Sequence, residues 1–167
     1  MTDLPPADRA TPEVVPFAKP APRPDAGRPR VLAVANQKGG VGKTTTAINL
    51  ATALAACDKR ILIIDIDPQA NATTGLGVPK GELERSSYDV LVDEAPIEGA
   101  LLATQVPNLW IVPGAVHLAG AELELAAAFG REHRLERALA ELTGRFDYVL
   151  IDCPPSLNLL ILDPIRS

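Results

Sequence analysis

The chain has 167 residues, 47% of them hydrophobic and 4% aromatic, and its net charge is −5. This length and composition suit one globular domain, and the negative charge excludes a chain-wide basic field that would attract nucleic acid. The sequence contains no apolar run of membrane-spanning length and no signal-peptide pattern at its start, so we expect a cytoplasmic protein.

The first 29 residues are rich in proline. Eight of the 16 prolines lie there, and four basic residues balance four acidic ones. Proline removes main-chain donors, and this stretch has little apolar surface to bury. We therefore predict that residues 1–29 are a disordered tail without stable contacts to the rest of the chain, with a partner-binding motif as the alternative.

Strand and helix patterns alternate from residue 30 onward. Val31–Ala35 is an apolar run typical of a buried parallel strand, Lys43–Ala56 has a helical pattern, and Arg60–Ile66 predicts a second buried strand. The expected buried face of the helix consists of Ile48, Leu50, Ala51, Leu54 and Ala55. Several glycines and prolines predict a loop over Asp67–Gly81.

The second half of the chain continues this alternation. The expected elements are short helices at Tyr88–Val92 and Ile97–Leu102, a strand at Leu109–Val112, a helical region at Leu118–Leu142 with Gly130 as a candidate break, and a strand at Tyr148–Ile151. Such alternation predicts an α/β fold, a parallel sheet with helices on both faces. Ligands of these sheets bind at the carboxyl ends of the strands, which is where the glycine-rich turn, Asp67 and Asp152 are expected to meet.

The glycine-rich turn Lys38–Thr45 reads Lys-Gly-Gly-Val-Gly-Lys-Thr-Thr. Glycines allow successive main-chain N–H groups to point at phosphate oxygens, and the helix that follows adds its positive end. Lys43 supplies a charge for the β- and γ-phosphates, and the Thr44 hydroxyl is placed to ligate Mg²⁺. The residues predicted to bind the nucleotide are Gly39, Gly40, Val41, Gly42, Lys43, Thr44 and Thr45.

Two carboxylate motifs follow later strands. Asp65 and Asp67 alternate at a strand end, which fits either a general base beside the γ-phosphate or an ordinary strand-ending turn. Asp152 ends the apolar run Tyr148–Ile151, and a carboxylate in this setting can hold Mg²⁺ through water. We predict Thr44 and Asp152 as the metal-binding residues.

The loop departs from the usual phosphate-loop pattern because Gln37 occupies the position of the first glycine and a second lysine, Lys38, precedes Lys43 by five residues. In this it resembles the ParA/MinD class of P-loop ATPases, which carry this deviant Walker A signature. The resemblance implies that Lys38 reaches across a dimer interface to the partner's nucleotide. The Asp-Pro-Gln of Asp67–Gln69 resembles the ParA (Soj) branch, which implies that Asp67 orients or activates the attacking water and that Asp65 supports the site.

The resemblance extends over about residues 30–160 and implies an ATP- and Mg²⁺-dependent partitioning ATPase in chromosome or plasmid segregation. It implies a nucleotide-dependent homodimer, a ParB-type partner protein and nonspecific DNA binding on the nucleoid. The family continues with further strands and helices that supply the basic residues for DNA, so DNA binding is not expected from these residues alone. We therefore expect residues 30–167 to be the N-terminal part of such a domain, incomplete at its C-terminus. The alternatives are a non-catalytic remnant and a MinD-like membrane-cycling ATPase.

Four other residues have ordinary interpretations. Cys57 and Cys153 are expected to be small buried residues rather than a disulfide or a metal pair. His133 is expected to be solvated, and Trp110 to lie in the core.

Overall fold

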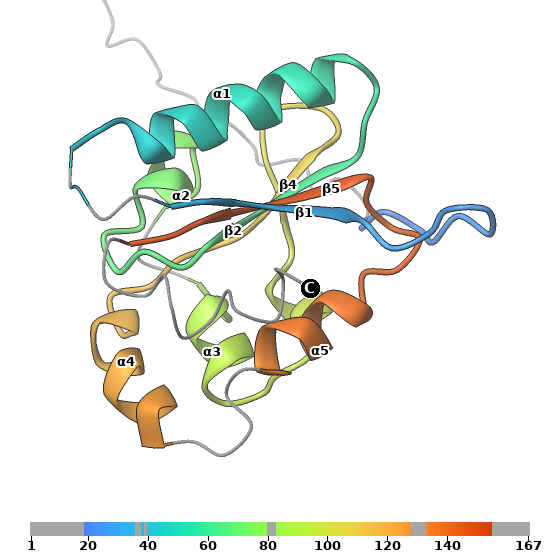
Figure 1. The fold of residues 1–167 in the computed structure, drawn as a ribbon. Coiled ribbons are helices and arrows are strands. Elements are labelled where there is room, and N and C mark those ends of the chain that lie inside the picture. The colour runs from blue at the N-terminus through green and yellow to red at the C-terminus, as the bar shows by residue number, and fades with distance from the viewer. Residues whose placement is uncertain (1–18, 36–37, 39, 80–82, 128–132, 155–167) are drawn as a thin grey trace, which may run out of the picture.

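The sheet is the centre of the molecule. The computed structural model describes residues 19–35, 38, 40–79, 83–127 and 133–154. Five strands are arranged in the order β1-β5-β2-β4-β3, with helices on both faces (Figure 1). The strands are β1 (Arg30–Val34), β2 (Ile61–Asp65), β3 (Leu102–Ala103), β4 (Leu109–Val112) and β5 (Tyr148–Asp152). All neighbours are parallel except β3, which pairs antiparallel with β4. The predicted α/β fold with a parallel sheet is confirmed; β3 was not predicted, because two residues are too few to form a recognisable pattern.

Helices α1 and α2 cover one face of the sheet, and α3, α4 and α5 cover the other (Figure 1). Their bounds are α1 (Lys43–Ala56), α2 (Asn71–Gly75), α3 (Ser87–Leu91), the 3₁₀ helix η1 (Ile97–Ala100), α4 (Leu118–Ala127) and α5 (Arg134–Ala140). The predicted helical region Leu118–Leu142 is thus two helices, although the candidate break at Gly130 lies outside the described residues. Helix α2 lies in a segment predicted as loop, because its sequence Asn-Ala-Thr-Thr-Gly has no apolar period. No helix among the described residues has the length and apolar character needed to cross a bilayer.

Strand β2 separates two apolar clusters, and all five of its residues are buried. Leu62 and Ile64 belong to the cluster beneath α3 and α5, whereas Ile61 and Ile63 belong to the cluster beneath α1 and α2. This alternation is what a strand covered on both faces requires. Trp110 lies in the first cluster, 5.6 Å from the ring of Phe146, which confirms its predicted core position.

Strand β1 lies at the edge of the sheet and not inside it. Among the described residues it pairs with β5 alone, and Leu32 is 40% exposed. The prediction of a buried parallel strand at Val31–Ala35 was therefore wrong about burial, although the strand is parallel as predicted. An apolar run shows that a strand can be buried. Whether it is buried depends on its position in the sheet, which the rest of the fold determines. Leu50 is similarly exposed, since α1 buries the narrower alanine stripe of Ala47, Ala51 and Ala55.

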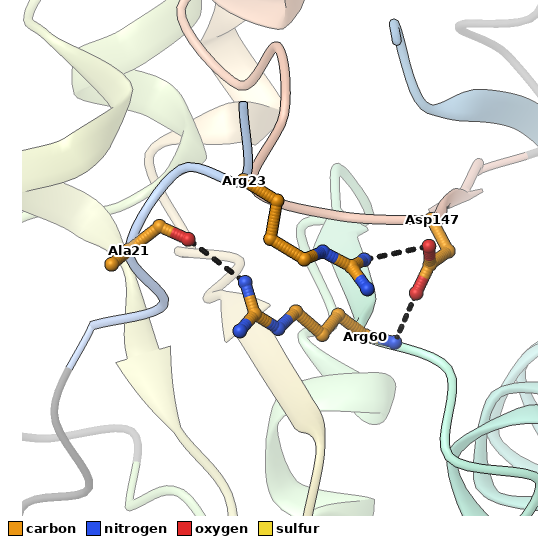
Figure 2. Close-up of polar contacts among 4 residues, drawn as sticks. All are labelled: Ala21, Arg23, Arg60 and Asp147. Atoms are coloured by element: carbon orange, nitrogen blue, oxygen red, sulfur yellow. Dashed lines mark hydrogen bonds and ion pairs between the residues drawn. The ribbon is translucent and has the colours of Figure 1, made fainter. Parts of the chain in front are cut away.

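Residues 19–28, which we call the docked segment, pack against the amino ends of the strands. Arg23 donates from Nη2 to Asp147 Oδ1 at 2.7 Å, and Arg60 donates from Nη1 to the Ala21 carbonyl at 2.8 Å (Figure 2). The main-chain N–H of Arg23 donates to the carbonyl of Gly144 at 2.9 Å, and that of Gly144 donates to the carbonyl of Gly27 at 3.2 Å. These contacts differ from the expectation of a tail without stable contacts; residues 1–18 lie outside the described residues. Prolines lack N–H donors, but the carbonyls of this segment and its Arg23 remain available for hydrogen bonds. These are the groups that bind the rest of the fold.

Candidate functional site

Three strands end side by side at the carboxyl rim of the sheet. In the register of the sheet, Asp152 at the end of β5 lies opposite both Val34, at the end of β1, and Asp65, at the end of β2. The glycine-rich loop begins at Lys38, four residues after Val34, so the loop and the carboxylates meet at one rim as expected. The parallel order of the strands brings these segments together, although more than eighty residues separate Asp65 from Asp152.

The loop has the backbone curvature that phosphate binding requires. Gly40 and Gly42 have φ angles of +69° and +80°, values that residues with a side chain rarely adopt. Gly42 is the N-cap of α1, and its carbonyl accepts hydrogen bonds from the Thr46 N–H at 2.9 Å and the Thr46 hydroxyl at 2.8 Å. These bonds fix the start of the helix, whose first N–H groups have no helical acceptor and point toward the loop.

Lys43 closes the loop on itself. Its Nζ donates to the carbonyl of Lys38 at 3.2 Å, which joins the two lysines of the signature. Both lie on the outer side of the fold, Lys38 exposed and Lys43 half-buried, so a ligand can reach the Lys43 ammonium. Val41 is 44% exposed, Thr44 is half-buried and Thr45 is exposed. Gly39 lies outside the described residues.

Asp152 is buried without hydrogen-bond partners. It is 1% exposed, and neither of its carboxylate oxygens accepts a hydrogen bond from the described residues. Burial raises the pKa of Asp152, as does the charge of Asp67, whereas the neighbouring Thr44 hydroxyl and Lys43 ammonium lower it. The Thr44 hydroxyl is therefore close enough to favour the ionised form, yet it does not reach hydrogen-bonding geometry.

A buried carboxylate without a partner is expensive unless a cation or a water held by one compensates it. A hydroxyl and a carboxylate oxygen are ligands that Mg²⁺ accepts, with waters and substrate phosphates completing its shell. Thr44 and Asp152 therefore fit an ion of this kind. No cluster of three or more histidine, cysteine, aspartate or glutamate side chains that could hold a metal ion occurs among the described residues.

Asp65 acts as a brace behind the rim. It is fully buried and accepts hydrogen bonds from the Thr73 N–H at 2.9 Å, the Thr73 hydroxyl at 2.7 Å and the Asp67 N–H at 3.1 Å. The Thr73 hydroxyl in turn accepts the Gly114 N–H at 2.9 Å. Burial raises the pKa of Asp65 to about 6, against the opposing effect of these donors, and the charge of Asp152 adds a smaller increase. The brace ties the ends of β2 and β4 to α2, which positions Asp67.

Asp67 is half-buried, its N–H donates to Asp65, and its charge acts on Asp152. Its Oδ1 accepts the Gln69 N–H at 2.8 Å, and its main-chain carbonyl accepts the Ala70 N–H at 2.9 Å. These bonds form the tight turn that the Asp-Pro-Gln sequence favours. The structure thus contains both features that the sequence left open, a strand-ending turn and a carboxylate near the rim.

Sequence reasoning missed Thr73 and Gly114. A Cβ atom on Gly114 would lie 2.9 Å from Asp65 Cγ and 2.9 Å from the Asp67 carbonyl oxygen, so this position has no room for a side chain. The signal was present, because Gly114 follows the end of β4 and the carboxyl ends of all parallel strands meet at this rim. Thr73 carried no local signal, because it lies in a short polar helix.

The remaining singled-out residues do not belong to the site. Cys153 is buried, and burial raises the pKa of its thiol to about 12, which keeps it an inert thiol. Cys57 ends α1 and is exposed, so the expectation that both cysteines are buried was wrong for it. His133 is exposed and lies 3.1 Å from Glu136, in agreement with a solvated position.

A family model described as an AAA domain matches residues 29–165 of the chain. With the phosphate loop and the partnerless carboxylate on one rim, this defines a P-loop nucleotide-binding protein. The sporulation initiation inhibitor protein Soj of Bacillus subtilis is 51% identical over 138 residues, covering 83% of this chain and 54% of Soj. The chromosome partitioning protein ParA of Caulobacter vibrioides is 54% identical over 140 residues, covering 83% of this chain and 52% of ParA. The chain belongs to the ParA/Soj family of deviant Walker A ATPases.

Solved structures agree with this assignment. Cobyrinic acid a,c-diamide synthase from Mycobacterium smegmatis, solved with bound ADP and magnesium, matches with a TM-score of 0.74 at 47% identity, covering 79% of this chain and 54% of that chain. A plasmid partition protein from Borrelia burgdorferi matches with a TM-score of 0.63 at 29% identity, covering 78% of this chain and 57% of that chain. The chain spans about half the length of the curated relatives it matches.

Proposed function

We propose that this chain carries the nucleotide site of a partitioning ATPase that binds Mg-ATP and hydrolyses it. The observation that carries the proposal is Asp152, a buried carboxylate beside the phosphate loop whose two oxygens have no hydrogen-bond partner among the described residues. Burial and the charge of Asp67 raise its pKa, and the Thr44 hydroxyl and the Lys43 ammonium lower it, so groups from the phosphate loop lie near this carboxylate. The relatives named Soj and ParA favour partitioning over the membrane-cycling alternative.

Each residue has a distinct part in this mechanism. Lys43 would exchange its bond to the Lys38 carbonyl for the β- and γ-phosphates, while the loop N–H groups hold the remaining phosphate oxygens. Thr44 and Asp152 would hold Mg²⁺, which supplies neutralising charge on the transferred phosphoryl group. Asp67, positioned by the Asp65 brace and by its own turn, would orient or activate the attacking water.

The wider cycle is part of the same proposal. Lys38 lies on the exposed side of the loop, where it can reach the nucleotide of a second copy in an ATP-dependent homodimer. We infer three further properties from the family alone, without support from a contact described above. They are reset by a ParB-type partner, nonspecific DNA binding, and a location in the cytoplasm on the nucleoid. The other candidate is a chain that binds nucleotide without turning it over.

Titration calorimetry with Mg-ATP tests the central step. Lys43→Ala should weaken Mg-ATP binding by at least about tenfold, a modest effect for a charged hydrogen-bonding partner. Arg137→Ala is the matched control, since Arg137 lies on α5 and pairs with Glu94. Equal affinity of wild type and Lys43→Ala would refute the assignment of the loop. Binding without phosphate release would favour the non-catalytic alternative.

A further inference from the structure

A second polar pocket lies at the opposite end of the sheet from the nucleotide site. Arg30 and Tyr148 are the first residues of β1 and β5, and Lys59 precedes β2, so the pocket opens at the amino ends of the strands. Its volume is about 250 Å³, and its other wall comes from Ala26–Arg28 of the docked segment. We call this hollow the basal pocket.

Three cations line the basal pocket without partners. The side chains of Arg28, Arg30 and Lys59 are exposed and make no hydrogen bond or ion pair with any residue in the part of the chain that the structure describes. Neighbouring arginines behave differently: Arg23 pairs with Asp147, Arg60 donates to the Ala21 carbonyl, and Arg145 pairs with Glu98 at 3.0 Å. Among the described residues, three cations without a hydrogen-bond or ion-pair partner thus line one pocket.

The acid in the pocket wall is hydrogen-bonded to groups other than these three side chains. Asp147 Oδ1 accepts from Arg23 Nη2 at 2.7 Å and Oδ2 accepts from the Arg60 N–H at 2.7 Å, so both oxygens are engaged outside the group of three (Figure 2). Three like charges around one hollow repel each other, and a bound anion would relieve that repulsion. The concentration of positive charge is notable in a chain whose net charge is −5.

We propose that the basal pocket binds a small phosphate-bearing anion through Arg28, Arg30 and Lys59. Planar guanidinium groups match phosphate oxygens in a bidentate manner, and a lysine adds a point charge. The volume lies below the roughly 300–1,000 Å³ of pockets for drug-sized ligands, which favours a phosphate- or pyrophosphate-sized group over a whole cofactor. A nucleic acid would require an extended basic track, whereas these cations converge on one hollow.

The docked segment couples this site to the fold. Gly27 and Arg28 contribute to the pocket only while the segment is seated, and the seat depends on Arg23 and Asp147. Releasing the segment should therefore weaken the anion site without touching the phosphate loop.

The test measures pyrophosphate binding by titration calorimetry in the Lys43→Ala chain, at low salt and without Mg²⁺, so that the loop contributes little. Adding Arg28→Gln and Lys59→Gln together should weaken binding by at least about tenfold, because each removes a charge-assisted contact. Arg137→Gln, which removes one charge on α5, should leave it unchanged. Arg23→Gln should also weaken it, and circular dichroism melting confirms that each variant is folded.

Three outcomes would overturn the proposal. They are no pyrophosphate binding by the Lys43→Ala chain, equal binding with and without the pocket substitutions, and binding of a short DNA duplex through these residues without binding of pyrophosphate. The last outcome would indicate a nucleic-acid surface instead.

Discussion

The two ends of β5 each carry an aspartate, and the two differ in almost every respect. Asp147, just before the strand, has both carboxylate oxygens engaged, by Arg23 and by the Arg60 N–H. Asp152, at the end of the strand, is 1% exposed, and within the described part of the chain nothing donates a hydrogen bond to either of its oxygens. A satisfied carboxylate stabilises the fold, whereas a buried unsatisfied one costs stability and is retained where a ligand completes it. Hydrogen-bond satisfaction therefore separates the structural acid from the acid that we propose as a metal ligand.

The largest effect is expected at Asp67. Its side chain accepts the Gln69 N–H, which makes it intermediate between the fully bonded Asp147 and Asp152, whose oxygens accept no hydrogen bond from the described residues. Asp67→Ala should lower ATP turnover by roughly 10²-fold, the usual scale for losing a general base, while Mg-ATP affinity is retained. Asp67→Asn is the sharper variant, because its amide oxygen can still accept the Gln69 N–H and keep the turn. Phosphate release at saturating Mg-ATP is the measurement, and undiminished release by Asp67→Asn would remove this residue from the mechanism.

Asp152→Asn should separate binding from stability. We expect the Mg²⁺-dependent part of ATP affinity to fall by at least about tenfold, because a neutral amide is a poorer partner for the hydrated ion. The free energy of unfolding should not fall, since the substitution removes a buried charge without partners. Calorimetry with and without Mg²⁺, together with urea unfolding, measures both quantities. Asp147→Asn is the control at the other end of the strand.

Asp147→Ala should show the reverse behaviour. It leaves the Arg60 N–H without its acceptor and frees the docked segment from its arginine contact, so the free energy of unfolding should fall by about 1–3 kcal/mol. Most of this loss belongs to the main-chain bond, because Arg23 is 41% exposed and its ion pair is screened by solvent. Mg-ATP affinity should not change. Asp25→Ala removes an exposed acid of the same segment and should leave unfolding unaffected.

The smallest effect concerns pH and Asp65. Its pKa is raised from 3.8 to about 6 in the folded chain, so between these values the folded state holds more protons than the unfolded state. The stability contribution of this group therefore falls as pH rises from about 4 to 6. Asp65→Asn should remove that slope. Urea unfolding followed by Trp110 fluorescence at several pH values measures it; identical slopes would contradict the assignment.

Local patterns predicted much of the fold. The helix Lys43–Ala56 has the predicted bounds, and the ends of β2, β4 and β5 fall within about one residue of the predicted ones, because apolar runs there are bounded by glycines, charges or prolines. The structure brings Lys43, Asp67 and Asp152 together, and the sequence pointed to them because each stands directly after a strand-like run or within a glycine-rich turn. Their roles stay predictions.

The remainder depends on contacts between distant segments. The burial of β1 could not be read from its composition, since that depends on its place at the sheet edge. Thr73, Gly114 and the docked segment act through partners that lie between 8 and 124 residues away in the chain, and no local pattern encodes such contacts.

The outer side of β1 has a consequence for handling the protein. With β5 as its only partner among the described residues and Leu32 exposed, this edge presents main-chain donors and acceptors beside an apolar side chain. An edge of this kind is a template on which another strand can add. Copies of the chain should therefore associate through this edge, so the light scattered per unit mass of protein should rise with concentration. Replacing Leu32 with lysine should reduce this association, because charge on an edge strand opposes strand addition.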